Sequence, residues 1–287
     1  MITHLKTRTK GVALSLVGIT LLSPDSLLLR LINADVWTLV FWRGGLSAIG
    51  LICMTLLIDK KIRYREIIFI GKHGVAVAVG FAVSALAFVF AIMNTAVSNA
   101  LVIMSISPLL AAILSYVLFR EATASRTWLA ATAITVGLGS VFLGSLETNR
   151  LAGDLSALIA SMALAFCFVM IRKHREVNML PSLAWSGFLV CLLVSPLAAP
   201  LSVTGMSLLL TLLLCLFIVP VGMGMITLSP RYISAPEVSL IMRLEVLLAP
   251  FWVWLVLGEV PSIQTLIGGA IILASLTLLS VLSMRSR

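Results

Sequence analysis

Long apolar stretches, separated by short polar breaks, follow one another along the whole chain of 287 residues. A helix that crosses the hydrocarbon core of a bilayer needs about 20 consecutive apolar residues. The pattern contains ten stretches near that length, at residues 11–32, 36–58, 74–93, 96–119, 126–146, 153–171, 182–200, 206–228, 235–257 and 262–283. The pattern therefore predicts an all-α integral membrane protein with ten transmembrane helices.

The composition supports the same prediction. Hydrophobic residues make up 61% of the chain and charged residues 11%, against about 45–50% and about 25% in soluble domains. Mean hydropathy is +1.16. No polar stretch is long enough to form the core of a soluble catalytic domain. The four cysteines lie in apolar stretches, so they predict neither a disulfide framework nor a metal site.

The basic residues are divided unequally between the two sides of the predicted membrane protein. With ten spans, 16 of the 20 lysines and arginines fall on the side of the termini, and only Arg30 and Arg150 fall on the other side. The remaining two, Arg43 and Arg243, lie within spans. Cytoplasmic segments carry an excess of Lys and Arg. Both termini and the segment 59–73 are therefore predicted to be cytoplasmic.

The two halves of the chain share a pattern. A shift of 138 residues places Glu121 at the end of span four on Glu259 at the end of span nine. The same shift superposes identical residues, namely Ile103 on Ile241, Met104 on Met242, and Leu109–Ala111 on Leu247–Ala249. We therefore predict two five-helix repeats, residues 1–146 and 147–287. An odd number of spans in each repeat gives the repeats opposite orientations, as in many secondary transporters.

Several of these features together resemble a known family. They are the positively flanked first helix, Phe41–Trp42–Arg43, Pro108 in span four, Glu121 and Glu259 at helix ends, and Gly153–Asp154–Leu155 at the start of the second half. In this pattern the chain resembles the EamA family of the drug/metabolite transporter superfamily. The resemblance implies ten helices, two inverted repeats and movement of small metabolites across the bacterial inner membrane by alternating access. One departure is that Glu245 is followed by valine where many members have proline, and the proline comes at Pro250.

Four ionisable residues lie within predicted spans: Asp25, Arg43, Arg243 and Glu245. A charge at the bilayer centre costs about 2.5–3.5 kcal/mol, so each needs a partner or a wet cavity. Asp25 and Arg43 lie at a similar depth on antiparallel neighbours and could pair. Arg243 and Glu245 are two residues apart, about 200° around a helix, so they point to opposite sides and at least one should face the central cavity. The alternative is a structural ion pair between helices, for example Glu245 with Arg43.

Further candidates come from aromatic and polar residues. The complete predicted substrate-binding set is Arg43, Glu245, Arg243, Trp42, Phe88, Asn99 and Ser105, and the proton-coupling candidates are Asp25 and Glu245. For Trp42 the alternative is a packed or lipid-facing ring, and for Asn99 and Ser105 it is helix–helix hydrogen bonding. Glu121 and Glu259, at helix ends beside water, favour structural roles over transport.

No enzyme or cofactor chemistry is indicated. The three histidines are scattered over the flanks of the spans, and the sequence contains neither a nucleotide-binding motif nor a Ser–His–Asp set. We therefore expect no metal, no cofactor, no nucleic acid and no catalytic residues. The expected partners are a small-molecule metabolite, protons as a coupling ion, and membrane lipids.

The function that these features favour is secondary-active transport by a multi-pass protein of the bacterial inner membrane. Amino acids or related small metabolites are the expected cargo, and export is the expected direction. Efflux of lipophilic cations is the alternative within transport, although two arginines near the midplane count against it. A non-transport scaffold or subunit is the alternative of a different class.

Overall fold

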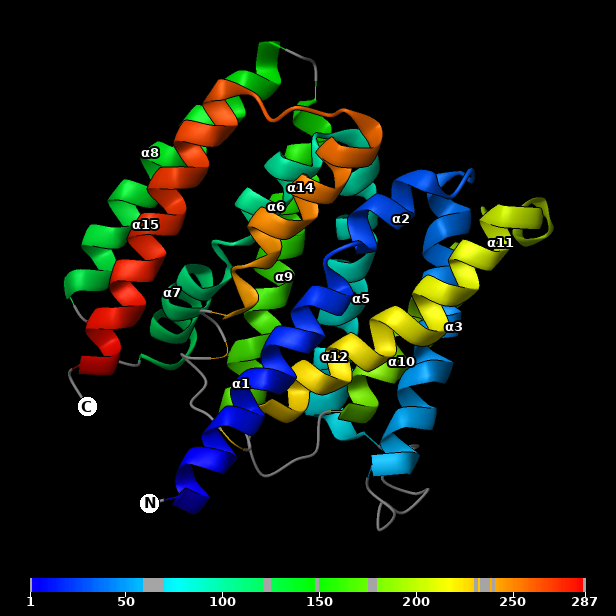
Figure 1. The fold of residues 1–287 in the computed structure, drawn as a ribbon, viewed down its shortest axis with the longest axis horizontal. Helices are drawn as coiled ribbons and strands as arrows, with labels where there is room; N and C mark the ends of the chain where they lie inside the picture. Colours follow the sequence, from blue (N-terminus) through cyan, green and yellow to red (C-terminus); the bar gives the residue numbers. More distant parts are fainter. Residues whose placement is uncertain are drawn as a thin grey trace.

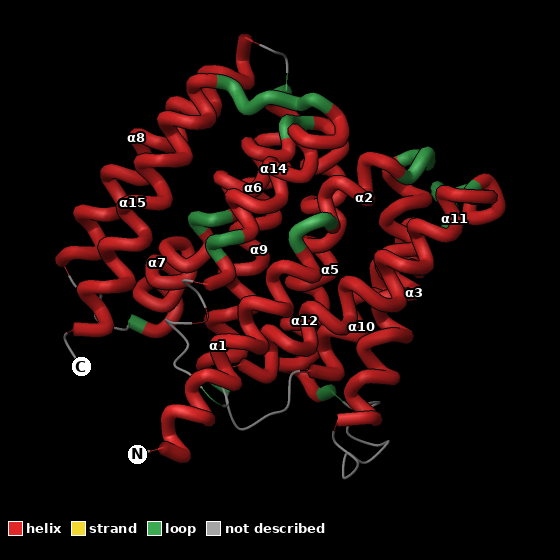
Figure 2. The backbone as a smooth tube through the Cα atoms, viewed as in Figure 1, coloured by secondary structure: helices red, strands yellow, loops and turns green. Residues whose placement is uncertain are grey.

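The computed structural model describes residues 2–58, 70–120, 125–147, 150–174, 180–229, 232, 238 and 241–285. Helices make up nearly all of this part of the chain, and it contains no strand (Figure 2). The N-terminus and the C-terminus lie at the same end of the helix bundle (Figure 1). We call this end the termini face and the other end the opposite face.

The helices are bounded as follows. The first half contains α1 (Ile2–Leu22), α2 (Asp25–Leu31), α3 (Val36–Ile58), α5 (Gly71–Asn94), α6 (Val97–Met104), α7 (Ser107–Phe119) and α8 (Ser125–Glu147). The second half contains α9 (Leu151–Lys173), α10 (Leu180–Val194), a 3₁₀ turn (Pro200–Ser202), α11 (Gly205–Leu212), a π-helical segment (Leu213–Ile218), α12 (Val219–Leu228), α14 (Glu245–Leu257) and α15 (Ile263–Arg285).

The described helices are apolar enough for a membrane protein. Six of these segments are long and apolar enough to cross a bilayer: Thr9–Leu31, Val36–Cys53, Gly71–Asn94, Val97–Phe119, Leu151–Ile171 and Gly205–Ile226. Shorter apolar helices cover Ala131–Gly144, Pro181–Val194, Glu245–Leu257 and Ile263–Leu278. Residues 59–69 of the predicted cytoplasmic segment 59–73, and residues 235–237, 239 and 240 of the predicted span 235–257, lie outside the described residues.

The two-repeat architecture is visible in the helix bounds. A shift of 138 residues places both ends of α7 on those of α14, and both ends of α8 on those of α15. α7 and α14 are each followed by a residue in the left-handed region, Arg120 with φ 52° and Gly258 with φ 68°. These cap positions are equivalent by the same shift. The repeat predicted from a few identities therefore extends to the register of whole helices.

Equivalent helices of the two halves run in opposite directions. α8 and α15 lie side by side (Figure 1), and Gly144 near the end of α8 faces Gln264 at the start of α15. Ser140 of α8 also donates a hydrogen bond of 3.1 Å to the carbonyl oxygen of Gln264. This antiparallel pairing of equivalent helices agrees with an inverted repeat.

Several predicted spans are interrupted. Predicted span 11–32 is two helices, because Pro24 has no N–H to continue the ladder of α1. Predicted span 96–119 is divided into α6 and α7 at Ser105–Ile106, directly before Pro108. The equivalent residues of the second half, Arg243–Leu244, form the same kind of turn before α14. The interruption thus keeps its place in the repeat although Glu245 is followed by valine.

Small residues allow the helices to approach closely, which is the usual basis of packing between membrane helices. A Cβ atom on Gly44 of α3 would lie 2.7 Å from the carbonyl oxygen of Gly187 on α10. Similar close approaches join α8 to α15 at Gly137 and Gly268, α1 to α12 at Gly18 and Gly222, and α5 to α9 at Gly80 and Cys167. These contacts hold helices of the first half against helices of the second half.

Candidate functional site

A cavity of about 230 Å³ lies between the two halves of the chain. Its walls come from α1, α2, α3, α5 and α6 of the first half and from α9, α10, α12 and α14 of the second half. Three ionisable residues line it: Asp25, Arg43 and Glu245. Most of the remaining wall is apolar and includes three methionines, Met104, Met223 and Met242.

Asp25 and Arg43 form a two-pronged ion pair on this wall. Arg43 Nη2 donates to Asp25 Oδ2 at 2.7 Å, and Arg43 Nη1 donates to Asp25 Oδ1. Asp25 is the first residue of α2, where the positive end of the helix dipole also favours a carboxylate. The Arg43 guanidinium lies over the ring of Phe88, with Cζ 5.3 Å from the ring centroid. The ion pair of Asp25 with Arg43, which the sequence analysis allowed, is therefore present. It uses both terminal nitrogens of the Arg43 guanidinium.

Glu245 lines the same cavity and is the first residue of α14. Its carboxylate forms no ion pair or hydrogen bond with any residue that the structure describes. It is close enough to Asp25 and Arg43 to interact with both electrostatically. When all three groups are ionised, the cavity wall carries one net negative charge. The alternative expected from the sequence, an ion pair of Glu245 with Arg43, is replaced by the pair of Arg43 with Asp25.

The other predicted site residues lie away from the cavity lining. Trp42 donates its indole N–H to the carbonyl oxygen of Pro200 at 3.3 Å. Arg243 donates to the Thr277 hydroxyl of α15 at 3.4 Å. Ser105 donates to the carbonyl oxygen of Val102 at 2.6 Å within its own turn.

Asn99, the remaining predicted residue, is buried and accepts a hydrogen bond from Thr265 at the start of α15. The structure thus brings Arg43, Phe88, Glu245 and Asp25 together. Trp42, Arg243 and Asn99 instead contact neighbouring segments, and Ser105 bonds within its own turn.

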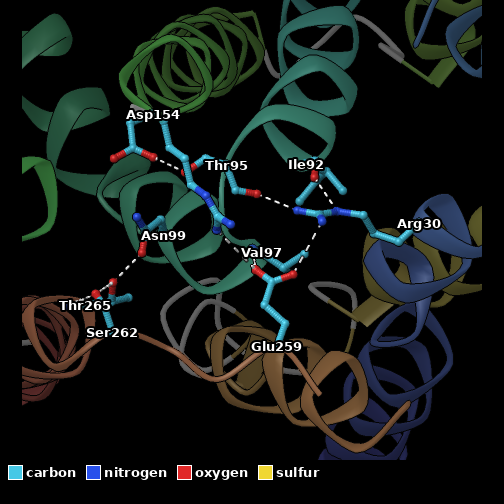
Figure 3. A network of polar contacts seen from close by, with 10 residues as sticks. Arg30, Ile92, Thr95, Val97, Asn99, Asp154, Glu259, Ser262 and Thr265 are labelled. Carbon is cyan, nitrogen blue, oxygen red and sulfur yellow. Dashed lines mark hydrogen bonds and ion pairs between the residues drawn. The ribbon is translucent and has the colours of Figure 1, made fainter. Parts of the chain in front are cut away.

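A second group of charged residues lies at the opposite face, around Arg30 (Figure 3). Arg30 Nε donates to the carbonyl oxygen of Ile92 at 2.7 Å, and Arg30 Nη2 donates to that of Thr95 at 2.5 Å. Arg30 Nη1 is also 3.4 Å from Glu259 Oε2. Arg30 therefore ties α2 to the turn between α5 and α6 and to the segment between α14 and α15.

Glu259 is the centre of this second group. Its Oε1 accepts a hydrogen bond from the backbone N–H of Val97 at 3.2 Å and lies 4.0 Å from Nη1 of Arg150. Beside it, the Thr95 hydroxyl donates to the fully buried Asp154 at 2.5 Å (Figure 3). We call Arg30, Arg150 and Glu259 the opposite-face cluster. It joins segments of both halves on the side away from the termini.

Sequence reasoning assigned Glu259 a structural role but did not predict this cluster. A usable signal was present, because Arg30 and Arg150 are the only basic residues assigned to their side and Glu259 was assigned to the same side. The structure also stacks His73 on His174, with ring centroids 3.8 Å apart, although they are far apart in the sequence. Within the described residues, no group of three or more His, Cys, Asp or Glu side chains could hold a metal ion.

Comparisons with known proteins agree with this architecture. The family model described as the EamA-like transporter family matches residues 9–143 and residues 151–281. A solved crystal structure of a protein resembles this chain with a TM-score of 0.65 and 16% sequence identity. The similarity covers 95% of this chain and 99% of that one, so the two share a fold. No curated protein matches the sequence.

Proposed function

The chain belongs to the EamA-like transporter family, and we propose that it is a secondary-active transporter that exports amino acids or related small metabolites by alternating access. In this proposal the chain crosses the bacterial inner membrane ten times, with both termini in the cytoplasm. The two halves, residues 1–146 and 147–287, rock against each other around the cavity between them.

The observation that carries the proposal is the position of the cavity relative to the opposite-face cluster. Binding sites of inverted-repeat transporters lie at the interface of the repeats, near the bilayer midplane. Here the cavity lining includes Leu51 of α3 and Leu183 of α10, in the parts of these helices that lie further from Asp35 and Val194 along the chain. Contacts of Arg30 and of the Val97 N–H with Glu259 join the halves at the opposite face. We therefore propose that this arrangement is a state open towards the termini face.

The charged groups of the cavity supply the proposed chemistry. Arg43, Phe88 and Glu245 are the proposed cargo contacts, because they line the cavity. Asp25 and Glu245 are the proposed proton carriers, since a carboxyl group exchanges a proton readily with water in such a path. Asp25 is held by Arg43, so Glu245 is the stronger candidate of the two. Trp42, Arg243, Asn99 and Ser105 are proposed to hold the surrounding helices.

Efflux of lipophilic cations is the second candidate, and one observation favours it. The two arginines no longer count against a cationic cargo. The charge of Arg43 is paired with Asp25, and Arg243 lies outside the cavity lining. Size counts the other way. Pockets for drug-sized ligands measure about 300–1,000 Å³, and this cavity measures about 230 Å³. A small metabolite is therefore the favoured cargo.

The test is transport by the purified protein in proteoliposomes. Amino acids and related metabolites are first screened for thermal stabilisation of the protein in detergent, and stabilising compounds are then measured as flux. We expect flux in the wild type and its loss in Glu245→Gln, with the amount of folded, monodisperse protein unchanged. A scaffold or subunit would give neither stabilisation nor flux. Wild-type flux by folded Glu245→Gln would remove this residue from the proposed site.

A further inference from the structure

Arg43 is the only arginine among the described residues that lines the cavity, and its guanidinium is already paired. Arg43 gives both nitrogens of its fork to the Asp25 carboxylate and lies over Phe88. A fork of this kind is the group that would bind the carboxylate of a cargo molecule. A cargo carboxylate would have to displace Asp25 from Arg43, and it would approach a wall on which Asp25 and Glu245 already bear two negative charges. The cavity is therefore unfavourable for an acid.

The Glu245 carboxylate, in contrast to the Arg43 guanidinium, is available to a cargo molecule. It lines the cavity, and it has no hydrogen bond or ion pair among the residues that the structure describes. A buried carboxylate is stabilised by a partner that brings positive charge and N–H donors. An ammonium group of the cargo supplies both.

The rest of the wall offers few other polar groups. The Ser47 hydroxyl has no hydrogen-bond partner among the described residues, but its oxygen is buried. The hydroxyls of Ser84 and Ser186 donate to carbonyl oxygens of Ala160 and Leu183, at 3.0 Å and 2.7 Å. Methionine and phenylalanine side chains cover much of the remaining surface, namely Met104, Met223, Met242, Phe81 and Phe88. Thioether and aromatic groups pack well against an apolar or aromatic body. The wall thus combines one available carboxylate with an apolar surround.

From these observations, and resting on the proposed transport through this cavity, we propose that the cargo is a small amine with an apolar body and no free carboxylate. Its ammonium group binds the Glu245 carboxylate, and its body lies against the methionines and Phe88. Glu245 is then the residue that selects for charge, while the ion pair of Asp25 with Arg43 excludes acids. Among metabolites related to amino acids, the structure assigns this cavity to amines.

Three compounds of similar size test the proposal on the purified full-length protein in nanodiscs. The probes are 2-phenylethylamine, L-phenylalanine and 3-phenylpropionate, which carry a phenyl ring on a short chain and differ in charge. Binding is measured by isothermal titration calorimetry at one pH near neutrality. We expect the amine to bind at least about tenfold more tightly than phenylalanine. A factor of about ten is the low end of the contribution of a charge-assisted hydrogen bond to affinity. We expect the acid to bind more weakly than either.

Two carboxylate-to-amide variants locate the binding group. Glu245→Gln should weaken binding of the amine by about tenfold or more while retaining the wild-type melting temperature. The matched control is Asp35→Asn, because Asp35 is exposed, accepts hydrogen bonds from Thr38 in its own turn and does not line the cavity. Asp35→Asn should leave amine binding unchanged. A third variant, Asp25→Asn, should free Arg43 and increase binding of 3-phenylpropionate.

Each contrary outcome has a definite meaning. Equal or tighter binding of phenylalanine than of the amine overturns this inference and leaves the proposed transport of amino acids standing. Absence of amine binding, or equal amine binding by wild type and Glu245→Gln, also overturns it. Failure of the proposed function is a separate result, namely amine binding that depends on Glu245 without flux of any compound in proteoliposomes.

Discussion

Arg30 and Glu259 join the two halves of the chain at the opposite face, with Arg30 Nη1 3.4 Å from Glu259 Oε2. Both side chains are partly exposed, at 23% and 20%. Isolated pairs of this kind contribute about 0–1 kcal/mol. Glu259 additionally accepts the Val97 N–H and lies near Arg150. The proposed alternating access needs a joint that can bias a conformation and still release it, and contacts of this strength would suit it.

The first prediction concerns this joint. Glu259→Gln removes the ion pair with Arg30, which joins the halves, so it should favour separation of the halves at the opposite face. A change of about 1–2 kcal/mol alters a population ratio by about 5- to 30-fold. Spin labels on cysteines introduced at Asn33 and Val260, which are both exposed on this face, report the separation by pulsed dipolar spectroscopy. The variant should show a larger fraction of long distances than the background protein without native cysteines.

Asp35→Asn is the matched control for this measurement. Asp35 lies on the same face, but its carboxylate accepts hydrogen bonds from Thr38 of its own turn. Its replacement should leave the distance distribution unchanged. The same distribution in Glu259→Gln and in the background would show that the ion pairs do not hold the joint closed.

Much of the fold was predictable because the bilayer restricts it. Apolar length, the unequal distribution of basic residues and the shift of 138 residues are all properties of the sequence. The interruptions were less predictable. Pro24 and Pro108 indicate two of them, but Arg243–Leu244 has no proline directly after it. Its turn could be expected only from the repeat, because the shift of 138 residues places Ser105–Ile106 on Arg243–Leu244.

The site was predictable only in part, because depth along a helix does not determine the direction of a side chain. Asp25 and Arg43 were placed at a similar depth and do pair. Glu245 and Arg243 were equally deep candidates, and only Glu245 lines the cavity. The helix rotation that separates them depends on the turn at Arg243–Leu244. The methionines of the wall carried no signal at all, since methionine is common in apolar spans.

The second prediction follows from the partner of Arg43. Arg43→Ala leaves the Asp25 carboxylate buried without its cation, and such a loss typically costs about 3–5 kcal/mol in the free energy of unfolding. Glu245→Gln removes no ion pair among the residues that the structure describes, so it should change stability far less. Reversible unfolding in mixed micelles measures both. From the sequence alone, Glu245 could have been the carboxylate that loses its cation in Arg43→Ala. In the structure, Asp25 is the carboxylate that loses it.

Replacing both Asp25 and Arg43 distinguishes two causes of lost stability, namely burial of a charge without its partner and loss of packing. Asp25→Leu/Arg43→Met replaces the ion pair with apolar side chains, which is often neutral or stabilising. We expect this double variant to unfold with a free energy closer to wild type than either single variant, Asp25→Leu or Arg43→Met. A double variant less stable than both singles would contradict the assignment of Asp25 as the partner that stabilises Arg43.

The third prediction tests orientation. Lys72 is exposed at the first turn of α5 on the termini face, and Val260 is 69% exposed on the opposite face. Cysteines introduced there, in a background without native cysteines, are treated with a membrane-impermeant thiol reagent in intact cells. Because basic residues remain cytoplasmic, we expect labelling at position 260 and protection at position 72. The reverse pattern would place the termini outside the cytoplasm.

The last prediction concerns the close approach of α3 and α10. A Cβ atom on Gly187 would lie 2.5 Å from the carbonyl oxygen of Gly44, and 3.0 Å from the Cβ of Ala48. Gly187→Ala should therefore force the two helices apart and lower the free energy of unfolding by about 1–3 kcal/mol, as overpacking of a core does. Gly268→Ala should act similarly on α8 and α15, because its Cβ would lie 2.4 Å from the carbonyl oxygen of Gly137.

Gly139 of α8 provides the matched control, since a Cβ atom there meets nothing within 4 Å. Gly139→Ala changes the same atoms in a helix of the same kind, so it should leave the free energy of unfolding unchanged or raise it slightly. Reversible unfolding in mixed micelles compares the three variants with wild type. Equal free energies of unfolding for Gly187→Ala and Gly139→Ala would mean that α3 and α10 accommodate the added methyl group without loss of stability. In that case the glycine contacts between the halves would not fix the packing from which the cavity is built.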